Sequence, residues 1–288
     1  MTSLVIVIVN HNTREELEEC LRSLNKHPPL VSYKTIVVDN HSIDGSVETL
    51  IKRWPDVKLI RLNTNIGFSK ANNLAVRTSA SDFILLLNSD TVVTAGAIDT
   101  MVRALHTHAD VAIVGPRLVN ERGTVEFSFG AMIGPFAQLK QILLRLGHQH
   151  GPPFLSIYLE KRTTQQQYPD WVSGACLLVR REDAESVGLL DEQFFMYCED
   201  VDFCAAVRKL NRRVLFIPTA EILHLRGRTA KKNQAAIETV YRRSQINFYA
   251  KHHPHWLGLL RLYLWFRGEL PAEIHELHDV KDSGLPDT

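Results

Sequence analysis

Three short apolar runs, each followed directly by Asn or Asp, constrain the fold of this chain most. The runs are Leu4–Val9, Thr35–Val38 and Phe83–Leu87. Apolar runs without alternation indicate strands buried on both faces, as in a parallel sheet. Helical patterns lie between and beyond them, at Arg14–Asn25, Ser46–Arg53 and Lys70–Thr78. This alternation predicts an α/β domain with a mostly parallel central sheet flanked by helices.

The pattern weakens after Asn120 and returns near residue 171. The excursion at 121–170 contains one predicted helix, Gln138–Leu146. The later elements are a strand at Trp171–Val179, a helix at Asp200–Leu210 and a strand at Val214–Ile217. We therefore expect one domain at 1–225, a helical basic and apolar appendage at 226–270, and a flexible tail at 271–288.

The composition is that of an ordinary globular protein. With 288 residues, 45% of them hydrophobic, the chain can bury a large core. A formal net charge of +1 indicates no polyanionic partner, and we expect no nucleic acid. The four cysteines form no C-x-x-C pair, which favours reduced thiols in the cytoplasm. The first apolar run has no basic segment before it, so it predicts a strand and not a signal peptide.

Polar side chains gather where the apolar runs end. Asn10, Asp39 and Asn88-Ser89-Asp90 occupy these positions. In open α/β sheets, ligands bind beyond the carboxyl ends of the strands. Asp39 could accept hydrogen bonds from a base or a ribose, and Asp90 could bind a hard cation between two phosphates. Turn or helix-capping roles would also explain both carboxylates.

A second group of candidates lies further along the chain. Glu199, Asp200 and Asp202 stand at a predicted helix start, where capping explains one or two acids but not three. The Glu199-Asp200 pair could supply a general base. His224 is either a metal ligand or a hydrogen-bonded core histidine.

Two arginines follow His224 closely. Arg226 and Arg228 flank a glycine after a predicted strand. Guanidinium groups bind phosphate oxygens well, so these two could clamp a diphosphate. A solvated basic surface is the alternative.

The order of these motifs is more specific than any one of them. The order is Asp39, NIGFSKANN at 65–73, Asn88-Ser89-Asp90, Trp171–Arg180 with Ser173-Gly174-Ala175, Glu199-Asp200, and His224. In this order the chain resembles the family 2 glycosyltransferases, which have the GT-A fold. The resemblance covers about residues 3–230, and is strongest to the rhamnosyltransferase-like subgroup acting on bacterial surface polysaccharides.

The resemblance implies a reaction. A sugar would move, with inversion, from a UDP- or dTDP-sugar, dTDP-rhamnose among them, to a hydroxyl of a saccharide or lipid-linked saccharide. Mg²⁺ or Mn²⁺ would bind the diphosphate. The D-x-D typical of the fold reads Asn88-Ser89-Asp90 here, so the motif has a single carboxylate.

The resemblance also implies a role for each candidate residue. Asp200 would be the base beside Glu199, Asp90 and His224 would bind the metal, and Trp171 and Gly174 would face the acceptor. Donor contacts would come from Asn10, Asp39, Asn65, Gly67, Asn72, Asn73, Ser89, Arg226 and Arg228.

The apolar segment 255–266 is too short to span a bilayer. It lies in a basic stretch, which favours an anionic lipid surface. Packing on the parent domain and a contact in a homodimer are the alternatives. Binding to an anionic lipid surface would mean peripheral association with the inner face of the plasma membrane.

Two other classes of protein compete with this interpretation. A nicotinamide-dependent oxidoreductase should carry G-x-G-x-x-G after its first strand, but the turn here reads NHNTREE. A non-catalytic binder of nucleotide sugars would lose the base or the metal ligand. This chain retains Asp90, Asp200 and His224, which favours catalysis.

Overall fold

The computed structural model describes residues 2–126, 128–134, 162–225 and 234–271. Its centre is an eight-stranded sheet in the order β3-β2-β1-β4-β9-β6-β10-β5, beside a two-stranded sheet of β7 and β8. The strands are β1 (Ser3–Asn10), β2 (Ser32–Asp39), β3 (Lys58–Arg61), β4 (Phe83–Asn88), β5 (Thr91–Val93), β6 (Val111–Val119), β7 (Phe129–Gly130), β8 (Trp171–Val172), β9 (Cys176–Arg180) and β10 (Arg213–His224).

The sheet is parallel in its first half and mixed in its second. β1 pairs in parallel with both β2 and β4, as predicted, and β2 pairs in parallel with β3, a strand that the sequence pattern did not predict. β6 and β10 are also parallel. In contrast, β9 runs antiparallel to β4 and β6, and β5 runs antiparallel to β10.

Two strand predictions need correction. The predicted strand Trp171–Val179 is two strands, β8 and β9, because the chain turns at residues 173–175 and the two segments join different sheets. The predicted strand Val214–Ile217 is only the first part of β10, which continues to His224. A register shift between Ile217 and Glu221 lets β10 continue along β6. A break in the apolar run hides this continuation from the sequence pattern.

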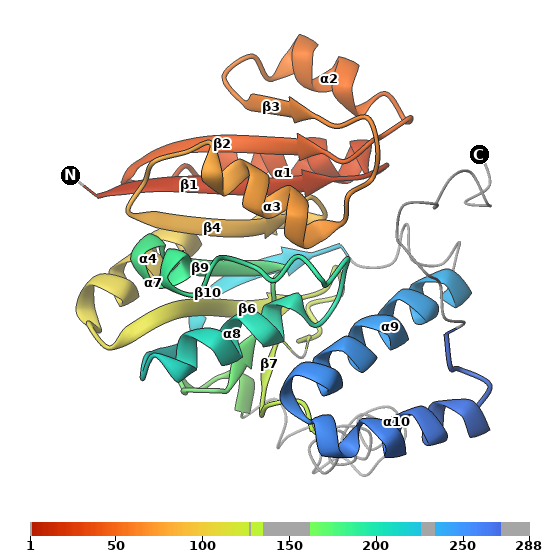
Figure 1. The fold of residues 1–288 in the computed structure, drawn as a ribbon. Helices are drawn as coiled ribbons and strands as arrows, with labels where there is room; N and C mark the ends of the chain where they lie inside the picture. The colour runs from red at the N-terminus through yellow and green to blue at the C-terminus, as the bar shows by residue number, and fades with distance from the viewer. Residues whose placement is uncertain (1, 127, 135–161, 226–233, 272–288) are drawn as a thin grey trace.

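Helices cover both faces of the sheet (Figure 1). The first face carries α1 (Arg14–Lys26), α2 (Ser46–Arg53) and α4 (Ala97–Thr107). The other face carries α3 (Phe68–Arg77), α7 (Arg181–Ser186) and α8 (Glu199–Lys209). The predicted helices match α1, α2, α3 and α8 to within two residues at each end. The predicted helix Gln138–Leu146 lies outside the described residues.

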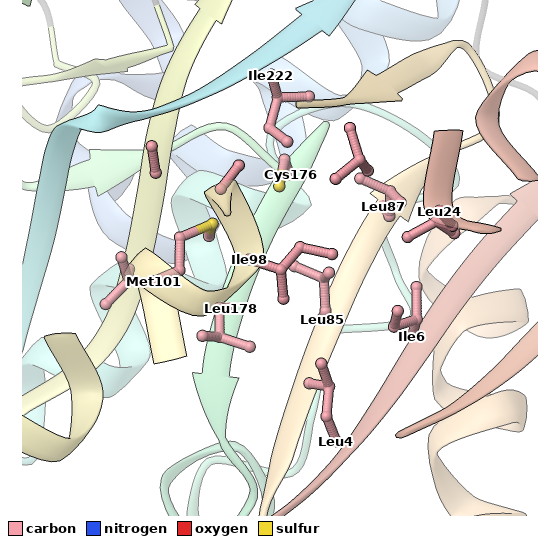
Figure 2. Close-up of a cluster of buried hydrophobic side chains, with 14 of the residues drawn as sticks. Leu4, Ile6, Leu24, Leu85, Leu87, Ile98, Met101, Cys176, Leu178 and Ile222 are labelled. Carbon is pink, nitrogen blue, oxygen red and sulfur yellow. The ribbon is translucent and has the colours of Figure 1, made fainter. Parts of the chain in front are cut away.

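The core on the first face is built from alternate residues of the buried strands. Figure 2 shows Ile6 of β1 and Leu85 of β4 beside Ile98 and Met101 of α4. All four side chains are almost completely shielded from solvent. Burying a large aliphatic side chain contributes about 1.5–3 kcal/mol, so this layer holds the strand order in place.

A helical hairpin of α9 (Gln234–His252) and α10 (Pro254–Phe266) occupies the predicted appendage. It lies next to α8 (Figure 1) and shares a small hydrophobic cluster with the start of that helix. The cluster includes Phe194, Cys198, Val201, Phe248, Tyr249, Leu260 and Leu264. The division into a domain at 1–225 and an appendage at 226–270 stays a prediction.

Asp202 anchors the hairpin electrostatically. Its buried carboxylate lies 2.9 Å from Lys251 Nζ and 2.6 Å from His252 Nε2. This third acid of the predicted cluster is therefore used to hold α9 against α8. No helix within the described ranges has the length and apolarity required to cross a bilayer. Of the predicted tail at 271–288, all but Pro271 lies outside the described residues.

Candidate active site

The ends of β1 and β2 hold a buried polar pair. Asn10 and Asp39 are register partners in the parallel ladder. Asn10 Nδ2 donates to Asp39 Oδ1 and to Ser42 Oγ, each at 3.0 Å, and Ser42 N–H donates to Asp39 Oδ2 at 3.0 Å. Asp39 is 1% exposed. Both of its oxygens are thus oriented by neighbours, as a preorganised recognition group requires.

A second polar layer joins β2 to α3. Asn40 Nδ2 donates to Asn65 Oδ1 at 2.8 Å, and the same oxygen accepts from Gly67 N–H at 3.0 Å. Gly67 has a φ of +85°, and a Cβ there would lie 2.6 Å from the Phe195 carbonyl oxygen. The glycine therefore allows the chain before α8 to approach α3 closely. Asn40 was not among the predicted site residues.

Asn72 and Asn73 are buried in α3 and bonded within the protein. Asn72 Nδ2 donates to the Phe68 carbonyl at 2.9 Å. Asn73 Nδ2 donates to the Leu190 carbonyl at 2.8 Å, and Asn73 Oδ1 accepts from Leu190 N–H at 3.1 Å. These contacts give Asn73 a structural role between α3 and the loop before α8. A role for either side chain in donor binding stays a prediction.

The β5–β10 pairing brings the two predicted metal ligands together. His224 pairs with Thr91, next to Asp90 in the turn after β4. His224 Nε2 lies 3.2 Å from Asp90 Oδ1. Ser89, on the other side of this turn, forms a 2.8 Å hydrogen bond with Thr13, whose hydroxyl also donates to Asn10 Oδ1. Polar contacts thus run from the Asp39 pair to this turn.

Glu126 binds the other side of the His224 ring. Its Oε2 lies 2.9 Å from His224 Nδ1. Burial lowers the pKa of His224, but hydrogen bonds to Asp90 and then to Glu126 outweigh it and raise the pKa to about 9. A carboxylate on the second nitrogen of a metal-binding histidine orients the ring and makes it more basic.

Sequence reasoning missed Glu126. The residue follows a tight turn at 120–123, after which Glu126 N–H donates to the Leu118 carbonyl at 2.9 Å. The turn folds the chain back along β6, which lies next to β10 in the sheet. Glu126 and His224 are 98 positions apart. A glycine turn is visible in the sequence, but no local pattern connects it with β10.

The donor set at this turn fits a divalent cation. One carboxylate, Asp90, and one imidazole, His224, offer oxygen and nitrogen ligands acceptable to Mn²⁺ and Mg²⁺. Across the described part of the chain, no group of three or more His, Cys, Asp or Glu side chains is arranged to hold a metal ion. Phosphate oxygens of a substrate would have to complete the coordination, as is common for Mg²⁺.

Asp200 lies at the start of α8 and is bonded to the turn between β8 and β9. Gly174 N–H donates to Asp200 Oδ2 at 2.8 Å, and Val201 N–H donates to Asp200 Oδ1 at 2.8 Å. A Cβ on Gly174 would lie only 3.2 Å from Asp200 Cβ. The same turn connects to β4, because Asn88 N–H donates to the Ala175 carbonyl at 2.9 Å. Asp200 is therefore linked through this turn to β4, the strand that precedes Asp90.

The chain entering α8 has an unusual conformation. Tyr197 and Cys198 both have positive φ values, 70° and 65°. Non-glycine residues in the left-handed region cost free energy, and such residues concentrate at functional sites. The two residues direct the chain so that the helix begins at Glu199.

Trp171, the predicted acceptor residue, donates from Nε1 to the Ala131 carbonyl at 2.8 Å.

Glu199 differs sharply from its neighbour. Its side chain is buried, and its Oε2 has no hydrogen-bond partner among the described residues. Burial first, and the charge of Asp200 second, raise the pKa of Glu199 well above its ordinary value. The two adjacent carboxyls therefore stand in different surroundings, and Glu199 is the one whose burial favours the neutral form. Arg226 and Arg228 lie outside the described residues.

Comparison with solved structures shows the class of fold. The mannosyltransferase PcManGT from Pyrobaculum calidifontis, in complex with GDP-Man and Mn²⁺, matches with a TM-score of 0.59 and 15% identity, over 91% of this chain and 69% of that one. GalNAc-T7 with UDP, GalNAc and Mn²⁺ matches with a TM-score of 0.61 and 17% identity, over 85% of this chain and 48% of that one. The predicted GT-A fold of glycosyltransferases is confirmed.

The sequence comparisons identify the family. The model of glycosyl transferase family 2 matches residues 5–186, and the chain belongs to this family. The N-acetylglucosaminyl-diphospho-decaprenol L-rhamnosyltransferase of Mycobacterium tuberculosis is 29% identical over 94% of this chain and 92% of its own length. The rhamnosyltransferase WbbL of Escherichia coli is 25% identical over 76% of this chain and 82% of its own length. The predicted resemblance to rhamnosyltransferase-like enzymes is confirmed.

Replacing Glu126 should weaken metal binding without removing it. In Glu126→Gln the His224 ring loses the carboxylate on its Nδ1 side, so Mn²⁺ affinity in the presence of UDP or dTDP should fall about 10–100-fold. The measurement is free Mn²⁺ by electron paramagnetic resonance. Glu121→Gln, an exposed change in the same turn, is the control. Equal Mn²⁺ affinity in the two variants would show that Glu126 does not support the site.

Glu199 should make the protein less stable as the pH rises. Above the unfolded-state pKa, the unfolded chain releases a proton that the folded chain retains, so the free energy of unfolding falls with pH. Glu199→Gln removes this fall of the free energy of unfolding with pH. Between the unfolded-state and the folded-state pKa of Glu199, the variant should gain on the wild type by up to about 1.4 kcal/mol per pH unit.

Urea unfolding at several pH values measures this difference. Glu182→Gln, an exposed change in α7, is the matched control and should run parallel to the wild type. If the Glu199→Gln curve also runs parallel to the wild type, Glu199 is not held protonated by the fold.

Proposed function

We propose that this glycosyltransferase is a metal-dependent, inverting enzyme that transfers a sugar from a nucleoside-diphosphate donor to a lipid-linked saccharide. One observation carries the proposal: the carboxylate–imidazole pair of Asp90 and His224 lies at the turn after β4, and hydrogen bonds link that strand to Asp200. A cation site beside a carboxylate base is what glycosyl transfer from a diphosphate requires.

The donor is proposed to be dTDP-rhamnose, with UDP-sugars as the alternative. Support comes from the two similar enzymes whose names specify rhamnosyl transfer. Asp39, fixed by Asn10 and Ser42, would accept hydrogen bonds from the nucleobase. Ser89 and the layer around Asn65 would contact the rest of the nucleoside diphosphate. Arg226 and Arg228 would add positive charge at the phosphates.

The acceptor is proposed to be a saccharide on a polyprenyl diphosphate. The similar enzyme of Mycobacterium tuberculosis carries a decaprenyl diphosphate in its name. Trp171 and Gly174 would line the acceptor side, because Gly174 is bonded directly to Asp200. The four buried thiols, all unpaired, support a cytoplasmic location.

The chemistry follows from where charge develops. Asp200 would take the proton of the acceptor hydroxyl as its oxygen attacks the anomeric carbon from the side opposite the leaving group. The bond to the diphosphate breaks in the same step, so the configuration inverts without a covalent enzyme intermediate. A divalent cation held by Asp90 and His224 would offset the charge gained by the diphosphate. Glu199, if neutral, leaves Asp200 as the only charged carboxylate of the pair.

Removing the base should separate turnover from donor binding. Asp200→Asn is nearly isosteric but cannot accept a proton, so turnover with dTDP-rhamnose should fall about a hundredfold or more. Donor affinity, measured by calorimetry, should barely change. Glu199→Gln should reduce turnover much less, because an amide and a protonated carboxyl are both neutral. If donor affinity falls in step with turnover in Asp200→Asn, the residue has a binding role.

Removing the cation ligand should abolish metal-dependent binding of the nucleoside diphosphate. Asp90→Ala removes the one carboxylate of the Asn88-Ser89-Asp90 motif. Mn²⁺ should therefore no longer increase the melting-temperature shift caused by dTDP or UDP, while the variant stays folded without ligand. Full turnover of the wild type in excess chelator would contradict metal dependence. Binding without any turnover would favour the non-catalytic alternative.

A further inference from the structure

Helix α10 is apolar on two opposite faces. One face buries Leu260 and Leu264 against the cluster shared with α8 and α9. At 100° per residue, the opposite face carries Leu259, Leu262 and Phe266. These three side chains are 57%, 49% and 73% exposed. The second face is therefore large, apolar and without a partner among the described residues.

Aromatic side chains border this outward face. Trp265 is 62% exposed and Tyr263 is 46% exposed. Contiguous exposed apolar patches of this kind mark interaction surfaces, since scattered single residues are the norm on a monomer. Trp and Tyr are the residues enriched where an apolar phase meets water, because their rings are amphipathic.

The charge around the face has one sign. Segment 254–266 contains no Asp or Glu, whereas Arg261 and His255 are both exposed on it. Just beyond the helix, Glu269 is paired with two arginines, at 2.6 Å from Arg267 and 2.7 Å from Arg242. A second copy of such a face would bring arginine toward arginine. An anionic surface would complement it.

We propose that the outward face of α10, formed by Leu259, Leu262 and Phe266 with their aromatic border, docks on an anionic lipid bilayer. The inference rests on the proposed lipid-linked acceptor, which must be met at a membrane surface. Leucine and phenylalanine would enter the acyl boundary, and Arg261 would lie among the headgroups. The helix would lie in the interface without crossing it.

The hairpin gives this surface a defined relation to the base. Asp202 lies two residues after Asp200 in α8 and binds Lys251 and His252 of α9. Ser244 of α9 donates to the Met196 carbonyl at 2.7 Å, in the segment that leads into α8. These contacts would connect a docked α10 to the helix that carries Asp200.

Vesicle flotation of the full chain tests the docking. Vesicles of phosphatidylglycerol with phosphatidylcholine should bind the wild type at low salt and release much of it at high salt, because the ionic contribution is screened. Leu262→Ser with Phe266→Ser should lower binding about tenfold or more, since two buried apolar side chains are lost. The control is Leu30→Ser, which alters an 87% exposed leucine on another part of the surface. It should bind as the wild type does.

A charge variant and a fluorescence measurement keep the test independent of folding. Arg261→Glu should weaken binding to the anionic vesicles at unchanged melting temperature. Brominated phospholipids should quench the tryptophan fluorescence of the wild type, and Trp265→Phe should remove most of that quenching. Equal flotation of all variants, or no quenching in bound protein, overturns the proposal.

Two further outcomes separate this inference from its alternatives. A lipid-free dimer that Leu262→Ser with Phe266→Ser dissociates, seen by analytical ultracentrifugation, would overturn membrane docking in favour of a homodimer. The dTDP- and Mn²⁺-dependent melting shift reports the nucleotide site alone. Vesicle binding without that shift would contradict the proposed function and support docking. The shift without vesicle binding would contradict docking only.

Discussion

Parallel pairing on both sides of β1 is the constraint on which the rest of the structure depends. Parallel strands end at the same edge of a sheet, so the residues that follow β1, β2 and β4 meet there. Asn10 and Asp39 are consequently in direct contact, and Thr13 connects them to Ser89. In this register Asn10 is the partner of Asp39, and a shift of either strand by one residue would separate the two.

The antiparallel half of the sheet completes the site with residues from distant parts of the chain. β5 follows β4 and pairs in antiparallel fashion with the end of β10. This pairing places His224 in contact with Asp90. The turn after β6 returns Glu126 to the same ring. The turn before β9 places Gly174 against Asp200. One edge of the sheet thus carries the Asp90–His224 pair and the buried Asp39 carboxylate, and the turn before β9 joins Asp200 of α8 to β4.

The site retains features that reduce stability. Glu199 is a buried carboxyl with an unpaired oxygen, and Tyr197 and Cys198 hold left-handed conformations just before it. Each costs free energy, which the cluster of α8, α9 and α10 offsets by burying Phe194, Val201 and Phe248. The hairpin therefore helps to hold the start of α8, and with it Asp200, in place.

Local pattern determined much of this protein. The apolar runs predicted β1, β2 and β4, the spacing of leucines predicted α1, and the ordered motifs predicted the family, because each depends on residues close together in the chain. The tertiary structure alone decided the break at residues 173–175, the length of β10, the structural contacts of Asn73, the anchoring role of Asp202 and the contact of Glu126 with His224. These features depend on which strands become neighbours, and strand order is set by the packing of helices on both faces of the sheet rather than by any local run of residues.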